Sequence, residues 1–142
     1  MPFTKKQGSG SVTLDIQGRN LPDLFTEGAR AYFSLVRHID SMKDDERVKV
    51  VVDAKDLSSL FDTWISELRE REKIHNVLFG EFRVASIQKV SANQYVLTGE
   101  AFGESGNADD GKSIGLAKNI TITEGKSSAQ TPLFLCSCNV KV

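Results

Sequence analysis

One apolar stripe constrains the fold of this chain more than any other feature of its sequence. Between residues 57 and 68, large apolar side chains recur at three- and four-residue steps, which is the period of an amphipathic helix. The stripe consists of Leu57, Leu60, Phe61, Trp64, Ile65 and Leu68. Asp56 precedes it as the predicted N-cap, and Glu67 and Arg71 stand four residues apart on the charged face. We therefore predict a helix that packs against a core, with the only tryptophan, Trp64, in that core and not in a binding platform.

A second amphipathic helix is predicted over residues 21–36, where apolar side chains again recur at helical spacing. Asn20 is its predicted N-cap, and Pro22 lies in the first turn, where its missing N–H costs nothing. His38 follows in the predicted last turn, where the helix dipole favours a cation. We interpret His38 as a capping group and not as a catalytic residue.

Alternating polar and apolar residues predict strands around these two helices. The predicted strands are residues 11–17, 47–54, 81–89, 95–103, 113–123 and 133–142. The order is therefore β-α-β-α-β-β-β-β. A single antiparallel or mixed sheet with both helices on one face would bury every apolar stripe, so we predict a two-layer α+β fold. All 142 residues are expected to form one domain, with residues 1–10 flexible.

Composition argues against several classes of function. Lys and Arg total 18 and Asp and Glu total 19, so the net charge is −1, and we expect no direct nucleic-acid binding. No run of 18 apolar residues exists, and no apolar secretory segment is present near the start, so we expect a cytoplasmic protein without a membrane span. Cys136 and Cys138 are expected to be reduced strand residues. With His38 and His75 they do not match the spacing of a structural zinc site.

The sequence also contains no constellation that predicts catalysis. It has no nucleophile–base pair, no phosphate-binding glycine loop and no paired acid and base carboxylates with a defensible geometry. Residues 109–112 (DDGK) lack the remaining ligands of a calcium loop and the spacing of a P-loop, so they are interpreted as a turn. We therefore expect no enzyme, no catalytic residue and no bound cofactor.

Two segments of the sequence resemble the archease family, in order and in register. The first is residues 18–25 (GRNLPDLF), followed by residues 33–35 (FSL). The second is residues 56–68, in which the pattern Asp-Leu-x-x-Leu-x-x-x-Trp-Ile-x-Glu-Leu is the more specific of the two. Lys112 matches the functional lysine of the family, whereas the family's following Tyr and His positions are Leu116 and Ala117 here.

The resemblance implies a role in tRNA processing. Archeases are small accessory proteins that help a GTP-dependent tRNA-splicing RNA ligase reach its guanylylated state and turn over more than once. The implied partner of this chain is therefore an RNA ligase. The alternative is a repurposed protein–protein interaction module on the same scaffold, with no role in RNA ligation. The sequence does not set the oligomeric state.

The sequence departs from the family at the divalent-metal site that the resemblance implies. In the family, an Asp at the opening of the first strand and an Asp at the extreme C-terminus hold the metal, with the lysine nearby. Counted back from Gly18, the first position is Ser11, and Asp15 is four residues away from it. After Glu124 the chain has no acidic residue, and Lys141 stands near its end. A hydroxyl brings no charge and an ammonium repels a cation, so we predict that this metal site is absent.

Overall fold

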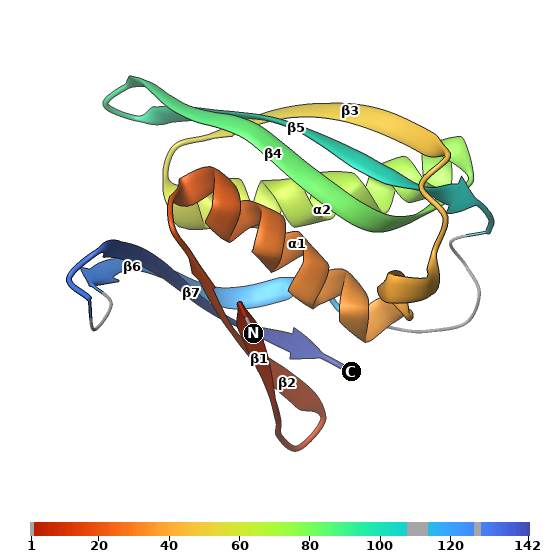
Figure 1. Cartoon of the computed structure of the whole chain (residues 1–142), viewed down its shortest axis with the longest axis horizontal. Coiled ribbons are helices and arrows are strands. Elements are labelled where there is room, and N and C mark those ends of the chain that lie inside the picture. The colour runs from red at the N-terminus through yellow and green to blue at the C-terminus, as the bar shows by residue number, and fades with distance from the viewer. Residues whose placement is uncertain (1, 108–113, 127–128) are drawn as a thin grey trace.

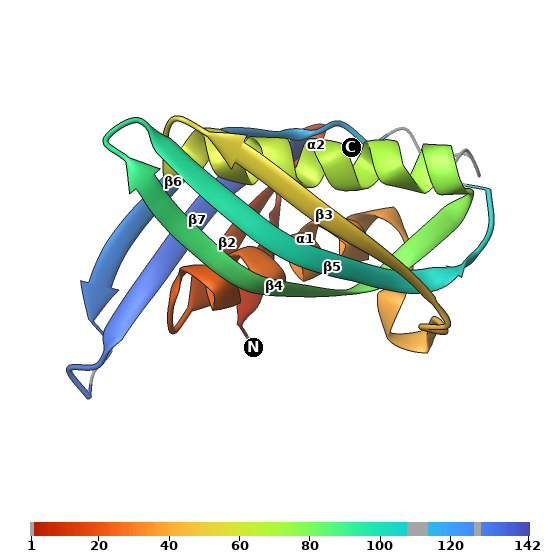
Figure 2. The same cartoon turned by 90° about the horizontal axis from the view of Figure 1, so that it is seen from above.

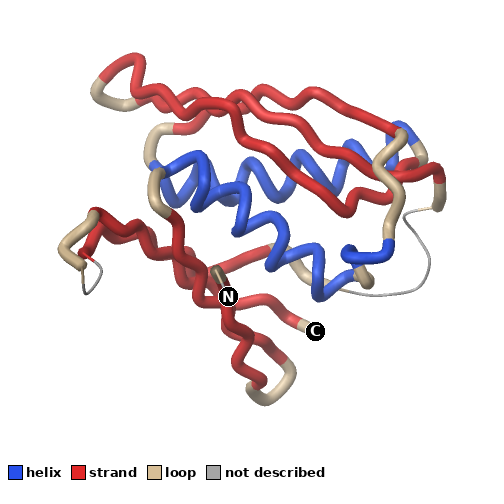
Figure 3. The backbone as a smooth tube through the Cα atoms, in the orientation of Figure 1, coloured by secondary structure: helices blue, strands red, loops and turns tan. Residues whose placement is uncertain are grey.

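Across residues 2–107, 114–126 and 129–142, which the computed structural model describes, two antiparallel sheets enclose a pair of helices (Figure 1). In chain order the elements are β1 (Phe3–Gln7), β2 (Ser11–Gly18), α1 (Leu21–Val36), a 3-10 turn η1 (Ile39–Ser41), β3 (Glu46–Ala54), α2 (Leu57–His75), β4 (Val77–Ser91), β5 (Gln94–Ser105), β6 (Ala117–Lys126) and β7 (Pro132–Lys141). The first sheet has the strand order β1-β2-β7-β6, and the second has the order β3-β5-β4. Strands therefore lie on both sides of the helical layer (Figure 3).

Both helices begin at the predicted caps. The Asn20 side chain accepts a hydrogen bond from the Asp23 N–H at 2.8 Å, and the Asp56 carboxylate accepts one from the Ser59 N–H at 2.7 Å. These bonds satisfy backbone donors that the first turn of a helix leaves without a partner. The first helix ends at Val36 and has no basic residue in its last turn, so the interpretation of His38 as a cap of α1 is wrong.

The core lies between the sheets, and the helices bury side chains in both directions. α1 packs against β2 and β4, whereas α2 packs against β3 and β6 (Figure 2). Trp64 is fully buried, as predicted, and its indole N–H donates to the Phe25 carbonyl at 3.1 Å. The Phe25 and Phe61 rings meet edge to face at 5.3 Å between centroids, which joins the two helices.

The α+β class, the two helices and the antiparallel strands are confirmed, but the strands form two sheets and not the single one that was expected. The difference has a physical reason. Alternation shows that one face of a strand is buried, but it does not show which strands pair with one another. α1 buries residues around much of its circumference, and both helices contact strands of both sheets, so the helical layer packs against two sheets at once.

The N-terminal segment is a further difference, because a flexible stretch was expected over residues 1–10. Phe3–Gln7 instead forms strand β1, which pairs with β2 through the partners Phe3 and Ile16. Gly10 has a φ of 74°, a left-handed conformation that glycine adopts without steric cost and that the hairpin turn requires.

Strand β6 also departs from the predicted alternation. A register shift between Lys118 and Thr121 contains Asn119 at a φ of 54°, so a bulge reverses the faces along the strand. As a result Ala117 is buried whereas Leu116 is 41% exposed. Within the described part of the chain, neither helix is apolar enough over a sufficient length to cross a bilayer.

Candidate functional site

Ser11, where the archease resemblance expects the first metal ligand, lies at one end of the first sheet, beside the last residues of the chain. Ser11 opens β2, and its direct partner on β7 is Lys141. Directly opposed residues of an antiparallel pair point to the same face of the sheet. Because Val12 and Val140 point into the core, Ser11 and Lys141 point to the face away from the helices, which we call the outer face.

Backbone and side-chain bonds hold this end of the sheet in place. The Val142 N–H donates to the Gly10 carbonyl at 3.1 Å, and the Gly115 N–H donates to the Lys141 carbonyl at 2.9 Å. On the inner side, the buried Tyr32 hydroxyl donates to the Gly115 carbonyl and accepts from an Arg69 guanidinium N–H, both at 2.9 Å. Burial raises the pKa of Tyr32, although Arg69 opposes the shift, so the hydroxyl keeps the proton that it donates.

Sequence reasoning missed the Tyr32–Arg69 link. Tyr32 was counted in the apolar stripe of the first helix, and Arg69 belongs to the charged end of the second. Nothing in the sequence shows that the hydroxyl at the end of a buried ring meets a carbonyl 83 residues further along the chain.

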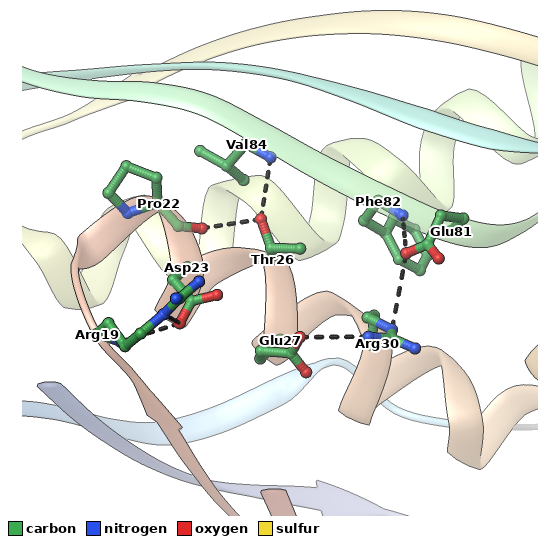
Figure 4. Close-up of polar contacts among 9 residues, drawn as sticks. All are labelled: Arg19, Pro22, Asp23, Thr26, Glu27, Arg30, Glu81, Phe82 and Val84. Carbon is green, nitrogen blue, oxygen red and sulfur yellow. Dashed lines mark hydrogen bonds and ion pairs between the residues drawn. The ribbon is translucent and has the colours of Figure 1, made fainter. Parts of the chain in front are cut away.

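A second polar cluster joins α1 to β4 (Figure 4). The Thr26 hydroxyl donates to the carbonyl one turn earlier at 2.8 Å and accepts from the Val84 N–H at 3.0 Å, beside a register shift in β4. Arg30 donates to Glu27 at 3.3 Å, and its Nε lies 3.7 Å from Glu81. These side chains contact one another and hold α1 against β4. The cluster contains no nucleophile with an adjacent base.

A buried ion pair connects the C-terminal ends of both helices to β4. The Glu72 side chain is 1% exposed and accepts from Arg37 at 2.6 Å and 3.3 Å. The same carboxylate accepts from the Phe79 N–H at 2.9 Å, and Arg37 donates to the Phe79 carbonyl at 3.1 Å. α1, α2 and β4 therefore meet at one ion pair. Because this pair is buried, its role is structural.

The cysteines are unpaired thiols in the core, as the sequence predicted. Cys136 and Cys138 are both buried on the inner face of β7. A hydrogen bond with Cys138, together with burial, raises the pKa of Cys136. This thiol is therefore protonated at neutral pH and is a poor metal ligand or nucleophile.

Comparison with known proteins identifies the family. Residues 10–131 match the model of the Archease protein family. The chain belongs to the archease family. It is similar to curated archeases from Methanopyrus kandleri (27% identity over 89 residues, 63% of this chain and 64% of the relative) and Pyrococcus furiosus (30% over 87 residues, 61% and 60%). These alignments span less than two thirds of the length of either archease.

A solved structure confirms the archease fold. The solution structure of Methanobacterium thermoautotrophicum protein 1598 is similar over 99% of both chains, with a TM-score of 0.74 and 20% sequence identity. The likeness shows the shared fold, with two helices on antiparallel sheets.

Ser11 and Lys141 together do not fit a divalent cation. Ser11 offers an uncharged hydroxyl, and the facing Lys141 offers an ammonium group that repels a cation. Among the described residues, no group of three or more His, Cys, Asp or Glu side chains is arranged to hold a metal ion. Lys112, the family-matched functional position, lies outside the described residues, as do its neighbours 109–111.

Proposed function

We propose that this protein is an accessory factor of a GTP-dependent tRNA-splicing RNA ligase and acts in the cytoplasm without catalysing a reaction itself. The observation that carries the proposal is the archease family match across residues 10–131, on a fold shared with a solved relative. Its partner is then the ligase protein. The absence of a catalytic role is supported by the polar clusters described above, whose charged groups are engaged with one another in structural contacts.

A reconstituted ligation reaction tests this role. Ligase is mixed with GTP and an excess of cleaved RNA, with and without this protein, and ligated product is counted per ligase molecule. We expect the protein to raise the count from about one to many, because an accessory factor acts by restoring the guanylylated ligase. A count that stays at one in the presence of excess protein contradicts the proposal.

Two lysine variants, one at the family-matched position and one as its control, make the assay specific to that position. Lys112→Ala removes the family-matched side chain and is expected to abolish the stimulation. Lys89→Ala, on the hairpin of β4 and β5, is the control and is expected to stimulate as the wild-type chain does. If both variants stimulate equally, the functional position of the family has not been inherited.

We also propose that the role does not require a metal ion held by this chain. The support is the pairing of Ser11 with Lys141, which brings a hydroxyl and an ammonium group together at this end of the sheet and offers no carboxylate. Calorimetric titration with calcium or magnesium is expected to give no binding, whereas the double variant Ser11→Asp with Lys141→Asp is expected to acquire it. Micromolar binding to the wild-type chain at a site including Ser11 would refute this.

The alternative is that the protein is a protein–protein interaction module that retains the archease fold and has no role in RNA ligation. The same Ser11–Lys141 pairing favours it, because it offers no carboxylate to a metal ion, and a chain without the ancestral task does not need one. In that case a pull-down from the native cell recovers partners other than the ligase, and ligation is not stimulated.

A further inference from the structure

The outer face of the first sheet carries no described helix or strand, because both helices pack on its other side (Figure 1). Strand register arranges its side chains in rows across the four strands. One row runs Lys6, Thr13, Asn139 and Lys118, since each of these residues is the direct partner of the next. Lys141 lies on the same face of β7, two residues beyond Asn139.

The end of the outer face that holds this row and Lys141 is cationic. Lys6, Lys118 and Lys141 come from three different strands, are all exposed, and take part in no ion pair within the described part of the chain. At about 4.8 Å per strand, the row from Lys6 to Lys118 spans roughly 14 Å. Between them, Thr13 donates its hydroxyl proton to the Asn139 side-chain oxygen at 3.0 Å, which orients the amide. The Asn139 amide N–H groups add donors to the three ammonium groups.

The next row is different in chemistry. It runs Thr4, Asp15, Ser137 and Thr121, again as direct partners across the strands. All four residues line a depression of about 350 Å³, with Leu135 as an apolar wall. Asp15 has no hydrogen-bond or ion-pair partner among the described residues, so its carboxylate can accept from a ligand.

The two rows together define one type of ligand. Rows on the same face lie two residues apart along a strand, which is roughly 6.7 Å. A phosphate chain fits the lysine row by charge, and a vicinal diol fits an unpaired carboxylate flanked by hydroxyl groups. We propose that the outer face binds a ribonucleoside polyphosphate, with its phosphates on Lys6, Lys118 and Lys141 and its ribose hydroxyls on Asp15. This site is additional to the accessory role proposed above.

Titration of the isolated full-length protein with ATP, in the absence of divalent cations, tests the site. Amide chemical shifts report where ATP binds, and calorimetry reports how tightly. We expect shifts confined to outer-face residues of β1, β2, β6 and β7, and an affinity that falls as salt is raised. Tripolyphosphate and 2′,3′-dideoxy-ATP separate the phosphate contribution from that of the ribose, and both are expected to bind more weakly than ATP.

Neighbouring residues of β1 provide a matched pair of variants. Lys6→Ala is expected to weaken ATP binding about two- to five-fold, as for an exposed ion pair. Lys5→Ala removes the same charge from the opposite face of the strand, where Lys5 is the partner of the buried Leu14, and is expected to change nothing. Asp15→Asn is expected to weaken ATP binding while leaving tripolyphosphate binding unchanged or tighter.

Three results with ATP would each overturn the inference: no shifts at millimolar ATP, equal losses for Lys5→Ala and Lys6→Ala, or an Asp15→Asn variant that binds ATP as the wild-type chain does. Tighter binding of a single-stranded RNA oligomer than of ATP would assign the face to a polynucleotide instead and overturns it as well. None of these results tests the accessory role, because that role is measured separately by ligase turnover.

Discussion

Substitution of Arg37 by methionine tests what holds the two helices to β4. The variant keeps most of the side-chain volume and removes the guanidinium that donates to Glu72 and to the Phe79 carbonyl. Glu72 is then left 1% exposed with a single remaining donor, the Phe79 N–H. An uncompensated charge in that position is the costly part of the change.

The expected loss is about 3–5 kcal/mol in the free energy of unfolding, the usual cost of removing one partner from a buried pair. With a denaturant slope of about 2 kcal/mol per molar urea, a loss of about 3 kcal/mol lowers the unfolding midpoint by about 1.5 M. The double variant Arg37→Met with Glu72→Gln removes both charges and retains an amide oxygen for the Phe79 N–H. It is expected to be more stable than Arg37→Met alone, because no buried charge remains.

Urea unfolding followed by the fluorescence of the single, buried Trp64 measures these differences. The control is Arg71→Met, which breaks the half-exposed pair with Glu67 at 2.8 Å on α2 and is expected to cost a few tenths of a kcal/mol. The reasoning is refuted if Arg37→Met costs no more than this control, or if the double variant is less stable than the single one.

Three further substitutions and conditions test other contacts. Gly28→Ala, which usually stabilises a helix, is expected here to lower stability by about 1–3 kcal/mol, because the new methyl group would collide with the Phe61 ring; a rise in the thermal midpoint would contradict this. Thr26→Val leaves the Val84 N–H without its acceptor and is expected to cost about 1–3 kcal/mol in urea unfolding, whereas Thr26→Ser keeps the hydroxyl and is expected to cost much less; a larger loss for Thr26→Ser than for Thr26→Val would show that the methyl group matters more than the hydrogen bond. Hydrogen bonds from the first turn of α2 hold the pKa of Asp56 below its ordinary value. This cap therefore stabilises the fold fully above the unfolded-state pKa, and its contribution to the free energy of unfolding falls as the pH drops towards the folded-state pKa. Asp56→Asn is expected to reduce the dependence of that free energy on pH in this acidic range, and an unchanged dependence would contradict the prediction.

The local features of the fold were predictable from sequence because their causes are local. A cap such as Asn20 or Asp56 bonds to an N–H three residues away, and the Trp64 stripe repeats within a few turns. Pairing between distant strands has no such local signal. Ser11 and Lys141 are 130 positions apart in the chain, and only the folded register shows that they face each other.

The same limit applies to the candidate site. The sequence shows that positions 11 and 141 carry Ser and Lys and not carboxylates, because that is a matter of residue identity. It does not show that Lys6 and Lys118 join them on one face, since this depends on the pairing of four strands. The bulge at Asn119 adds a further step, because one left-handed residue changes which side chains of β6 point outward.

The placement of the helices explains how residues on the outer face of the first sheet can change while the fold is kept. Both helices lie between the sheets, so the inner faces carry the core and the outer face of the first sheet carries little of it. The exposed Lys141 side chain lies next to the buried Val140, and its backbone carbonyl accepts from the Gly115 N–H whatever the side chain is. The charge of the outer face can therefore change sign with little loss of stability, whereas a change at Gly28 or Arg37 acts directly on the packing that both sheets share.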